Sequence, residues 1–410
     1  MKLNIAQKSW VLYDMGNAAY ALIVRTAFAA ILFKYCADEV WGKENTTAYW
    51  GYVCSLAGIV AGAVSITLGY LSDKLHCKKL LLGFFVLLGV ATTAEFAFVQ
   101  KGMAWSVAAL SFISLGCYMS ANSFYDSLLI SVAPRALRDR LSSVAYAFGY
   151  VGGVIPFILC LVLSLVMADK LLAMRLSFVI AACWWLVLTL PMMKTLRERK
   201  FASGTEHTLN FISEFKELLK NKNVTLFLIA YFLYIDGVGT IYTMAAPIAA
   251  DIGITTPQLM AVILGLQFLA FPCTLLYGKY ARRFHPRNLV LFAIGVYACI
   301  CLLALLLALP AFKEYRLHIF ILLAVLIGTS QGGIQSLSRS LFSRIVPPRK
   351  AAEFFGFYNL FGKFTTIVGP LLVGLATMLW GKAELGITIL VFPFVLGAIL
   401  LTKVDFTPAR

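Results

Sequence analysis

Several ionisable residues lie inside long apolar stretches of this sequence, where a charged side chain is costly. If such a stretch crosses a lipid bilayer, a charge at its centre costs roughly 2.5–3.5 kcal/mol on insertion scales. A charge is kept there mainly where it faces a water-filled cavity or a partner of opposite sign. Glu95 falls near the end of its stretch and is expected at the membrane interface. The full set of candidates is Asp14, Arg25, Glu95, Asp126, Asp236 and Lys363.

Polar residues recur at helical spacing around these charges. In a helix, residues three or four positions apart lie on the same face. Asp14 and Arg25 are separated by about three α-helical turns, so an unbroken α-helix would align them. The other polar stripes are Tyr118, Asn122 and Asp126; Asp236 and Thr240; Gln331, Gln335 and Arg339; and Asn359, Lys363 and Thr366.

This mixture of cations, acids and amides suits a zwitterionic ligand. Arg25 and Lys363 are expected to hold a carboxylate, Arg25 through a bidentate contact. Asp236, or alternatively Asp14 or Asp126, would hold an ammonium group or a coupling proton. Desolvation disfavours the charged form of such a carboxylate and a nearby cation favours it, so ligand binding could move a proton. Further binding residues are expected beside these charges: Asn17, Tyr20, Asn122, Tyr234, Gln331 and Gln335.

Structural roles compete with this interpretation. Asp14 and Asp126 lie toward the ends of their apolar stretches, where they would serve as gate charges or as helix-packing contacts. Arg25 could instead form a permanent ion pair with Asp236 or another acid. Arg339, the last residue of its stripe, is expected to take part in gating or coupling.

The composition predicts the elements that must position these residues. Hydrophobic residues make up 61% of the chain and charged residues 13%, whereas soluble domains average about 45–50% and about 25%. Each membrane span needs about 20 mostly apolar residues, so 410 residues accommodate twelve spans. The predicted fold is an all-α membrane protein with spans at Ser9–Cys36, Ala48–Leu71, Lys79–Val99, Ala104–Val132, Leu141–Met167, Leu171–Met193, Val224–Ala249, Gln258–Gly278, Asn288–Leu309, His318–Ile345, Ala351–Leu379 and Leu385–Leu401.

A polar stretch divides the predicted spans into two groups of six. We expect an N-terminal bundle over residues 1–193, a cytoplasmic linker over 194–223 with an amphipathic surface helix, and a C-terminal bundle over 224–410. Most Lys and Arg residues fall in loops on the side of both termini, which assigns that side to the cytoplasm. The net charge of +16 therefore indicates membrane orientation rather than nucleic-acid binding.

One loop carries a recognisable motif. Residues 69–79, GYLSDKLHCKK, resemble the Gly-x-Leu-Ala-Asp-Arg-x-Gly-Arg-Lys signature of the major facilitator superfamily. The Gly, Leu, Asp and later basic positions match, whereas His76 replaces the second Gly and Cys77 replaces the Arg. The resemblance implies a two-half, twelve-helix fold whose helices 1, 4, 7 and 10 line a central cavity. It also implies a gating role for Asp73.

Longer segments narrow this resemblance to one branch. Met15 and Ile235 stand where that branch usually has Trp and Asn, but the surrounding residues match. Together the segments resemble the vacuole-effluxer branch, known from fungal autophagy and widespread in bacteria. The resemblance implies amino-acid export from a lytic compartment in its fungal members. The segments are WVLYDMGNAA from Trp10, YFLYIDGVGT from Tyr231, QGGIQSLSRS from Gln331 and EFFGFYNLFGKF from Glu353.

The expected function is secondary active transport of a small polar metabolite, an amino acid or related zwitterion or anion, by proton-coupled alternating access. The alternatives are proton-coupled efflux of amphipathic drugs and, from another class, a non-transporting membrane receptor or sensor. An intramembrane enzyme is not expected, because no predicted span carries a His pair, a nucleophile elbow or paired catalytic carboxylates. We expect a monomer in a bacterial inner membrane, whose partners are a small-molecule substrate, the lipid bilayer and protons, without nucleic acid, cofactor or metal.

Overall fold

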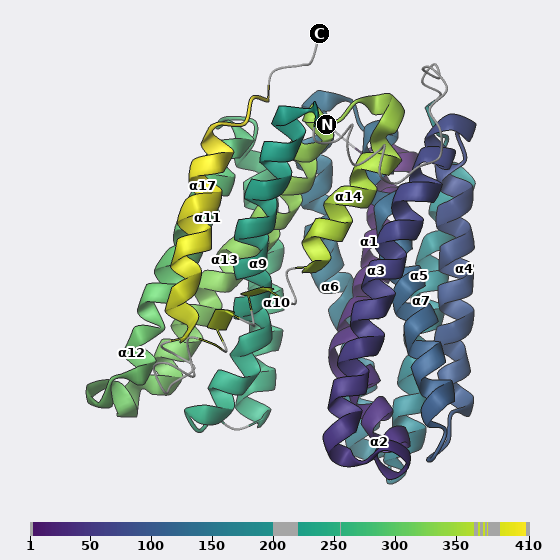
Figure 1. Cartoon of the computed structure of the whole chain (residues 1–410), viewed down its shortest axis with the longest axis vertical. Coiled ribbons are helices and arrows are strands. Elements are labelled where there is room, and N and C mark those ends of the chain that lie inside the picture. Colours follow the sequence, from purple (N-terminus) through teal and green to yellow (C-terminus); the bar gives the residue numbers. More distant parts are fainter. Residues whose placement is uncertain are drawn as a thin grey trace. The chain divides into compact units, whose positions relative to one another are not determined.

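The computed structural model describes residues 3–199, 220–254, 256–364, 368–369, 372–373, 375 and 386–406. Throughout these residues the regular structure is helical (Figure 1). The first half of the chain forms α1 (Ile5–Ala19), η1 (Tyr20–Phe28), α2 (Ala29–Trp41), α3 (Lys43–Leu75), α4 (Lys78–Glu95), η2 (Phe96–Phe98), α5 (Ala104–Val132), η3 (Arg135–Leu137), α6 (Arg138–Val166) and α7 (Lys170–Thr195). The second half forms α9 (Lys222–Asp251), α10 (Thr256–Tyr280), α11 (Pro286–Leu303), α12 (Leu305–Ala308), η4 (Pro310–Tyr315), α13 (Arg316–Ile345), η5 (Pro348–Lys350), α14 (Ala351–Phe364), η6 (Ile387–Leu390) and α17 (Val391–Thr402).

Long apolar helices dominate the described part of the chain. Ten helical stretches within it are long and apolar enough to cross a membrane, and Ile387–Thr402 forms a shorter apolar helix. Large apolar side chains such as Leu165 and Phe392 are more than 70% exposed, as expected for helices that face lipid rather than water. The predicted span Ala351–Leu379 begins as α14, and much of its remainder lies outside the described residues. The predicted total of twelve spans and the cytoplasmic placement of both termini remain predictions.

The first span differs from the single α-helix predicted over Ser9–Cys36. Its centre, Tyr20–Phe28, is a π-helix, and the N–H of Ala29 donates to the carbonyl of Val24 five residues earlier. Such a stretch does not keep the α-helical period, so the predicted alignment of Asp14 with Arg25 does not carry through it. Arg25 lies inside this π-helical stretch.

The described helices belong to two compact units. Unit 1 comprises residues 1–135, 148–211 and 347–360, and unit 2 comprises residues 136–147, 212–346 and 361–410. The helices α6 and α14 therefore contribute to both units: the start of α6 belongs to unit 2, and the start of α14 belongs to unit 1. The predicted linker over 194–223 falls largely outside the described residues, and the predicted six-plus-six division stays a prediction.

Inside unit 1, glycines bring α6 close to α1. A Cβ added at Gly152 would lie 2.9 Å from the Cα of Met15, and one added at Gly153 would lie 3.1 Å from the backbone of Ala18. Small residues at such positions let helix backbones approach each other, which is how helices associate in lipid. The glycine-rich run in α6 therefore has a packing role.

We predict that Gly152→Ala lowers the thermal stability of the purified protein. The new methyl group would overlap the α1 backbone, and overpacking of this kind typically costs roughly 1–3 kcal/mol. The matched control is Gly116→Ala in α5, where an added Cβ meets nothing within 4 Å. Thermal unfolding in detergent would measure both, and equal midpoints for the two variants would contradict the packing role.

Candidate functional site

A polar group in unit 1 is centred on Tyr118 of α5. The Arg25 guanidinium and the Asn122 side chain both lie near the Tyr118 hydroxyl. Arg25 is exposed and Asn122 is half-buried, so these donors remain open to a ligand. Among the described residues, no carboxylate forms an ion pair with Arg25. Residues from two of the predicted polar stripes thus come close together, although Arg25 lies in a π-helix rather than in the predicted α-helix.

Tyr20 supports this group by packing against Tyr118. Its side chain is fully buried, its ring stacks on Tyr118 with centroids 4.6 Å apart, and its hydroxyl lies 2.6 Å from the Ser114 hydroxyl. Ser114 is in turn 2.8 Å from the Thr93 hydroxyl. The Trp185 ring packs against Tyr20 at 5.0 Å. Because its hydroxyl is already partnered, Tyr20 is better placed to orient Tyr118 than to contact a ligand directly.

The other predicted polar residues of α1 and α5 are buried. Asp14 and Asn17 are each 8% exposed, and the Asn17 Oδ1 atom has no hydrogen-bond partner among the described residues. The Asp126 Oδ2 atom accepts a 3.0 Å hydrogen bond from the Asn359 side chain on α14. For Asp126, this contact favours the helix-packing alternative over direct ligand binding.

Asp73 holds the beginning of α14. We define the Asp73 cluster as Asp73, Lys78, Ala352 and Glu353. The Asp73 carboxylate forms an ion pair with Lys78, and both side chains are about 5% exposed. Its Oδ2 atom also accepts the backbone N–H groups of Ala352 at 2.8 Å and Glu353 at 3.1 Å. A carboxylate at this position satisfies amides that a helix N-terminus leaves unpaired, and it faces the positive end of the helix dipole.

The turn that follows Asp73 contains one departure from the motif. His76, at the position of the motif's second glycine, ends α3 with φ of 53°, in the left-handed region. Glycine enters that region at little cost, whereas non-glycine residues do so rarely. His76 therefore occupies a backbone conformation that a glycine at this position would enter more readily.

Glu198 was not identified from the sequence, yet it supports the same loop. Its Oε1 atom accepts the N–H of Lys79 in the first turn of α4, and the Lys79 Nζ donates to the Leu196 carbonyl at 2.9 Å. Burial raises the pKa of the Glu198 carboxyl, whereas the backbone N–H groups of Lys79 and Lys78 and the Lys78 charge lower it. No spacing pattern in the sequence connects this residue to a loop 119 positions earlier.

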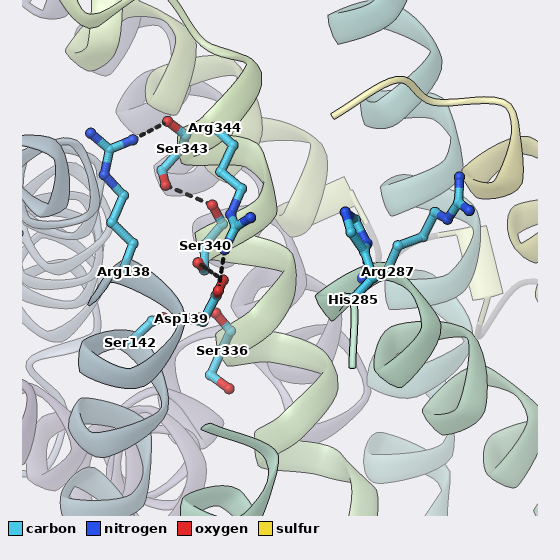
Figure 2. Close-up of polar contacts among 9 residues, drawn as sticks. All are labelled: Arg138, Asp139, Ser142, His285, Arg287, Ser336, Ser340, Ser343 and Arg344. Atoms are coloured by element: carbon cyan, nitrogen blue, oxygen red, sulfur yellow. Dashed lines mark hydrogen bonds and ion pairs between the residues drawn. The ribbon is translucent and has the colours of Figure 1, made fainter. Parts of the chain in front are cut away.

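A second cluster ties the start of α6 to α13 inside unit 2 (Figure 2). We define the Asp139 cluster as Asp139, Ser340 and Arg344. Asp139 forms an ion pair with Arg344 and accepts a hydrogen bond from the Ser340 hydroxyl. Beside it, the Arg138 guanidinium donates to the Ser343 carbonyl at 2.6 Å. Asp139 was not identified from the sequence because it falls between two predicted spans.

Arg339, predicted to act in gating or coupling, belongs to this same contact. It is 1% exposed, its Nε donates to the Ser142 hydroxyl at 2.9 Å, and its guanidinium lies 4.4 Å from the Tyr146 ring centroid. These partners lie on the first three turns of α6. Such a contact can hold these two helices together, which is compatible with gating.

Figure 2 also shows His285 and Arg287 at the beginning of α11. The His285 Nδ1 atom accepts the Arg287 N–H at 3.2 Å and so caps this helix. Burial lowers the pKa of the His285 imidazole, and the positive charges of Arg287 and Arg344 lower it further. Neutral imidazole is the form that can accept this hydrogen bond.

The acid predicted in the seventh span, Asp236, lies on α9. It is 2% exposed, and its Oδ1 atom accepts the backbone N–H of Gly369 at 3.0 Å. Two residues earlier, the fully buried Tyr234 places its hydroxyl 2.6 Å from that of Ser338. The contact between Tyr234 and Ser338 thus joins α9 to α13, as the contact between Tyr20 and Ser114 joins η1 to α5 in unit 1.

Three predicted residues of unit 2 remain, and the structure describes the side chains of two of them. Gln331 and Gln335 are half-buried on α13, and the Gln331 Oε1 atom has no hydrogen-bond partner among the described residues. Lys363 lies in α14, but its side chain is outside the described part of the structure. Within that part, no group of three or more His, Cys, Asp or Glu side chains could hold a metal ion.

We predict that Asp73 and Lys78 are strongly coupled in stability. Removing one partner of a buried pair leaves an uncompensated charge, which typically costs roughly 3–5 kcal/mol. Asp73→Asn and Lys78→Met should therefore each lower the unfolding midpoint, and the double variant should lose less than the sum of the two losses. The control pair is Lys101 and Glu39, which are more than half exposed and should show almost no coupling. Additive losses at Asp73 and Lys78 would contradict the pairing.

Comparison with known proteins assigns the family. The family described as "Vacuole effluxer Atg22 like" matches residues 5–410. The chain is 38% identical over 413 residues to the "Uncharacterized MFS-type transporter YxiO" of Bacillus subtilis, covering 97% of this chain and 94% of that protein. It is 28% identical over 451 residues to "Autophagy-related protein 22" of Coccidioides immitis, covering 90% and 74%.

Solved structures show the same fold. A proton:xylose symporter, XylE, matches with a TM-score of 0.73 at 14% identity, covering 97% of this chain and 94% of that one. The human organic anion transporter MFSD10 matches with a TM-score of 0.72 at 16% identity, covering 97% and 99%. XylE is described as a major facilitator protein, and this chain shares the fold of both structures. None of these relatives is described as an enzyme. The chain is a multi-pass membrane transporter of the major facilitator superfamily and belongs to its vacuole effluxer Atg22-like family.

Proposed function

We propose that this protein is a secondary active transporter for a small metabolite that carries a carboxylate, an amino acid or a related zwitterion or anion. Transport proceeds by alternating access with proton coupling, in a bacterial inner membrane. The observation that carries the proposal is Arg25, an exposed guanidinium within a membrane span that has no carboxylate partner among the described residues.

A cation at this depth needs a compensating ligand or water. Its cost in a span is roughly 2.5–3.5 kcal/mol on insertion scales, so such residues are retained where they serve a pathway. The neighbouring Tyr118 and Asn122 offer further hydrogen-bond donors beside the guanidinium. A fork of N–H groups flanked by a hydroxyl and an amide matches the geometry of a carboxylate.

An acceptor for an ammonium group is available in the same unit. The Asn17 Oδ1 atom is buried and lacks a partner among the described residues. A buried acceptor without a partner costs about 1–3 kcal/mol. A ligand ammonium that reached this atom would recover that cost, which supports a zwitterionic substrate over a simple anion.

The direction of transport is proposed from the family. Its description refers to a vacuole effluxer, which favours export of the substrate from the compartment or cell. The solved structures support the fold alone, because they are at most 16% identical to this chain. Drug efflux remains the second candidate, since the rings of Tyr20, Tyr118 and Trp185 pack together into a buried aromatic cluster near Arg25.

The test is counterflow in proteoliposomes with a mixed pool of labelled amino acids. Wild-type protein should accumulate label, and an amino-acid amide that lacks the carboxylate should compete poorly. Arg25→Met should raise the half-saturating concentration about 10- to 150-fold, the loss expected for a charge-assisted hydrogen bond of 1.5–3 kcal/mol. Arg25→Lys should retain part of the activity.

The control variant is Lys101→Met, which removes an exposed cation of the same unit and should leave counterflow unchanged. Wild-type protein that is folded and inserted but accumulates no amino acid would contradict the substrate class. Equal competition by amines without a carboxylate would instead favour drug efflux.

A further inference from the structure

We propose that Thr26 is a positioning residue, which stabilises the π-helical register of the first span and thereby directs the Arg25 guanidinium toward Tyr118. The inference rests on the proposed function, because it takes Arg25 as the group that binds the substrate carboxylate. It adds a residue that acts on the substrate through Arg25 and that belongs to none of the polar stripes. All of these residues lie in unit 1.

The first observation is the hydrogen-bond pattern of η1. In an α-helix each backbone N–H donates to the carbonyl four residues earlier, whereas in a π-helix it donates to the carbonyl five residues earlier. At the end of η1, the Ala29 N–H donates to the Val24 carbonyl in this second pattern. The stretch is nine residues long, whereas most π-helical segments are single turns, often at functional sites.

The second observation is that the Thr26 side chain follows the same pattern. Its hydroxyl donates to the Ala21 carbonyl, five residues earlier, at 2.9 Å. Thr67 and Thr189, which lie in α-helices of the same unit, instead donate to the carbonyls four residues earlier, at 2.6 and 2.7 Å. The Thr26 hydroxyl therefore reinforces the backbone spacing of η1, and a donor inside a membrane span needs such a partner.

The third observation is that Tyr20 and Arg25 approach the same residue, Tyr118 of α5. The Tyr20 ring stacks on Tyr118 with centroids 4.6 Å apart, and the Arg25 guanidinium lies near the Tyr118 hydroxyl. In an α-helix, two residues five positions apart lie about 140° apart around the axis and point to different sides. In the π-helical pattern the fifth residue lies above the first, as the fourth does in an α-helix. The π-helix thus brings both side chains to one face.

An α-helical register would place a different residue above Tyr20. That residue is Val24, four positions later in the chain. Val24 is apolar and 1% exposed, and its side chain has no donor for a carboxylate. The Arg25 guanidinium would turn away from Tyr118, and a ligand would lose its fork of N–H groups. The register of the first span therefore decides whether a cation or an aliphatic side chain occupies this position.

This arrangement links Thr26 to the affinity for substrate. A ligand that binds one of two conformations has its apparent affinity reduced by the fraction of protein in the competent conformation. The Thr26 hydroxyl contributes one neutral hydrogen bond to the π-helical register. Its removal should therefore lower the competent fraction by up to about 12-fold. A ligand that makes no use of Arg25 should be affected much less.

The experiment is counterflow in proteoliposomes with Thr26→Val, which keeps the shape of this exposed side chain and removes its hydroxyl. The half-saturating concentration for the labelled amino acid that wild-type protein accumulates best should rise by about 2- to 12-fold, with the maximal rate unchanged. Competition by the corresponding amide, which lacks the carboxylate, should stay the same. The preference for the acid over the amide should therefore fall by the same factor, whereas a merely structural defect would weaken both competitors alike.

Three further variants control this measurement. Thr26→Ser keeps the hydroxyl and should return the half-saturating concentration to within about twofold of wild type. Thr67→Val removes an exposed hydroxyl from an α-helix of the same unit and should leave counterflow unchanged. Thr26→Ala should reproduce the loss, and it provides the test if Thr26→Val fails to fold.

A second measurement follows the contact without any substrate. Arg25→Met and Tyr118→Phe should have non-additive effects on the unfolding midpoint, since residues in contact are coupled. This coupling should persist when Thr26→Ser is added to each variant of the cycle. It should disappear when Thr26→Val is added, because the guanidinium then no longer faces Tyr118.

The outcomes separate this inference from the proposed function. Absence of wild-type counterflow with amino acids would contradict the proposed substrate class and would leave the coupling measurement to decide the role of Thr26. An unchanged preference for the acid over the amide in folded Thr26→Val would overturn this inference while the proposed transport stands. Persistence of the coupling between Arg25 and Tyr118 in Thr26→Val would overturn it as well.

Discussion

Buried carboxylates satisfy hydrogen-bond donors in both units of this protein. In unit 1, Asp73 on α3 accepts the first amides of α14 and Asp126 on α5 accepts the Asn359 side chain, and in unit 2, Asp236 on α9 accepts the Gly369 N–H. Each acid is less than 10% exposed. In a membrane, backbone groups without partners and charges without compensation are both costly. Pairing such a donor with a carboxylate satisfies both groups, and the start of α14 is held in this way inside unit 1.

The two units use the same means to fix a buried tyrosine. Tyr20 on the first span pairs with Ser114 on α5, and Tyr234 on α9 pairs with Ser338 on α13, each with hydroxyl oxygens 2.6 Å apart. A buried tyrosine hydroxyl requires a partner, and a serine one helix away supplies it without adding charge. The recurrence agrees with the weak internal repetition expected of a chain built from two related halves.

Much of the fold was predictable because the apolar period and the loop charges carry it. The polar stripes identified Arg25, Tyr118 and Asn122, and the motif identified Asp73, but the roles assigned to these residues remain predictions. The π-helix was not predictable, because a uniformly apolar run contains no residue that marks a change of helical period. Asp139 and Glu198 were missed since their partners, Arg344 and Lys79, lie more than 100 residues away along the chain. Contact of Asp236 with a backbone N–H was hidden for another reason, because every residue except proline carries that donor.

The start of α14 belongs to unit 1 although it is synthesised late in the chain, which has a consequence for folding during synthesis. Asp73 accepts hydrogen bonds from residues 279 and 280 positions later in the chain. At about 5–20 residues per second, a ribosome would take roughly 15–55 s to make the intervening chain. Throughout that interval the Asp73–Lys78 pair, at the loop between two predicted spans, would lack the α14 amides that finally cover it. The nascent first half must therefore tolerate an incomplete acid site, through water or a transient partner, until nearly the whole protein has been inserted.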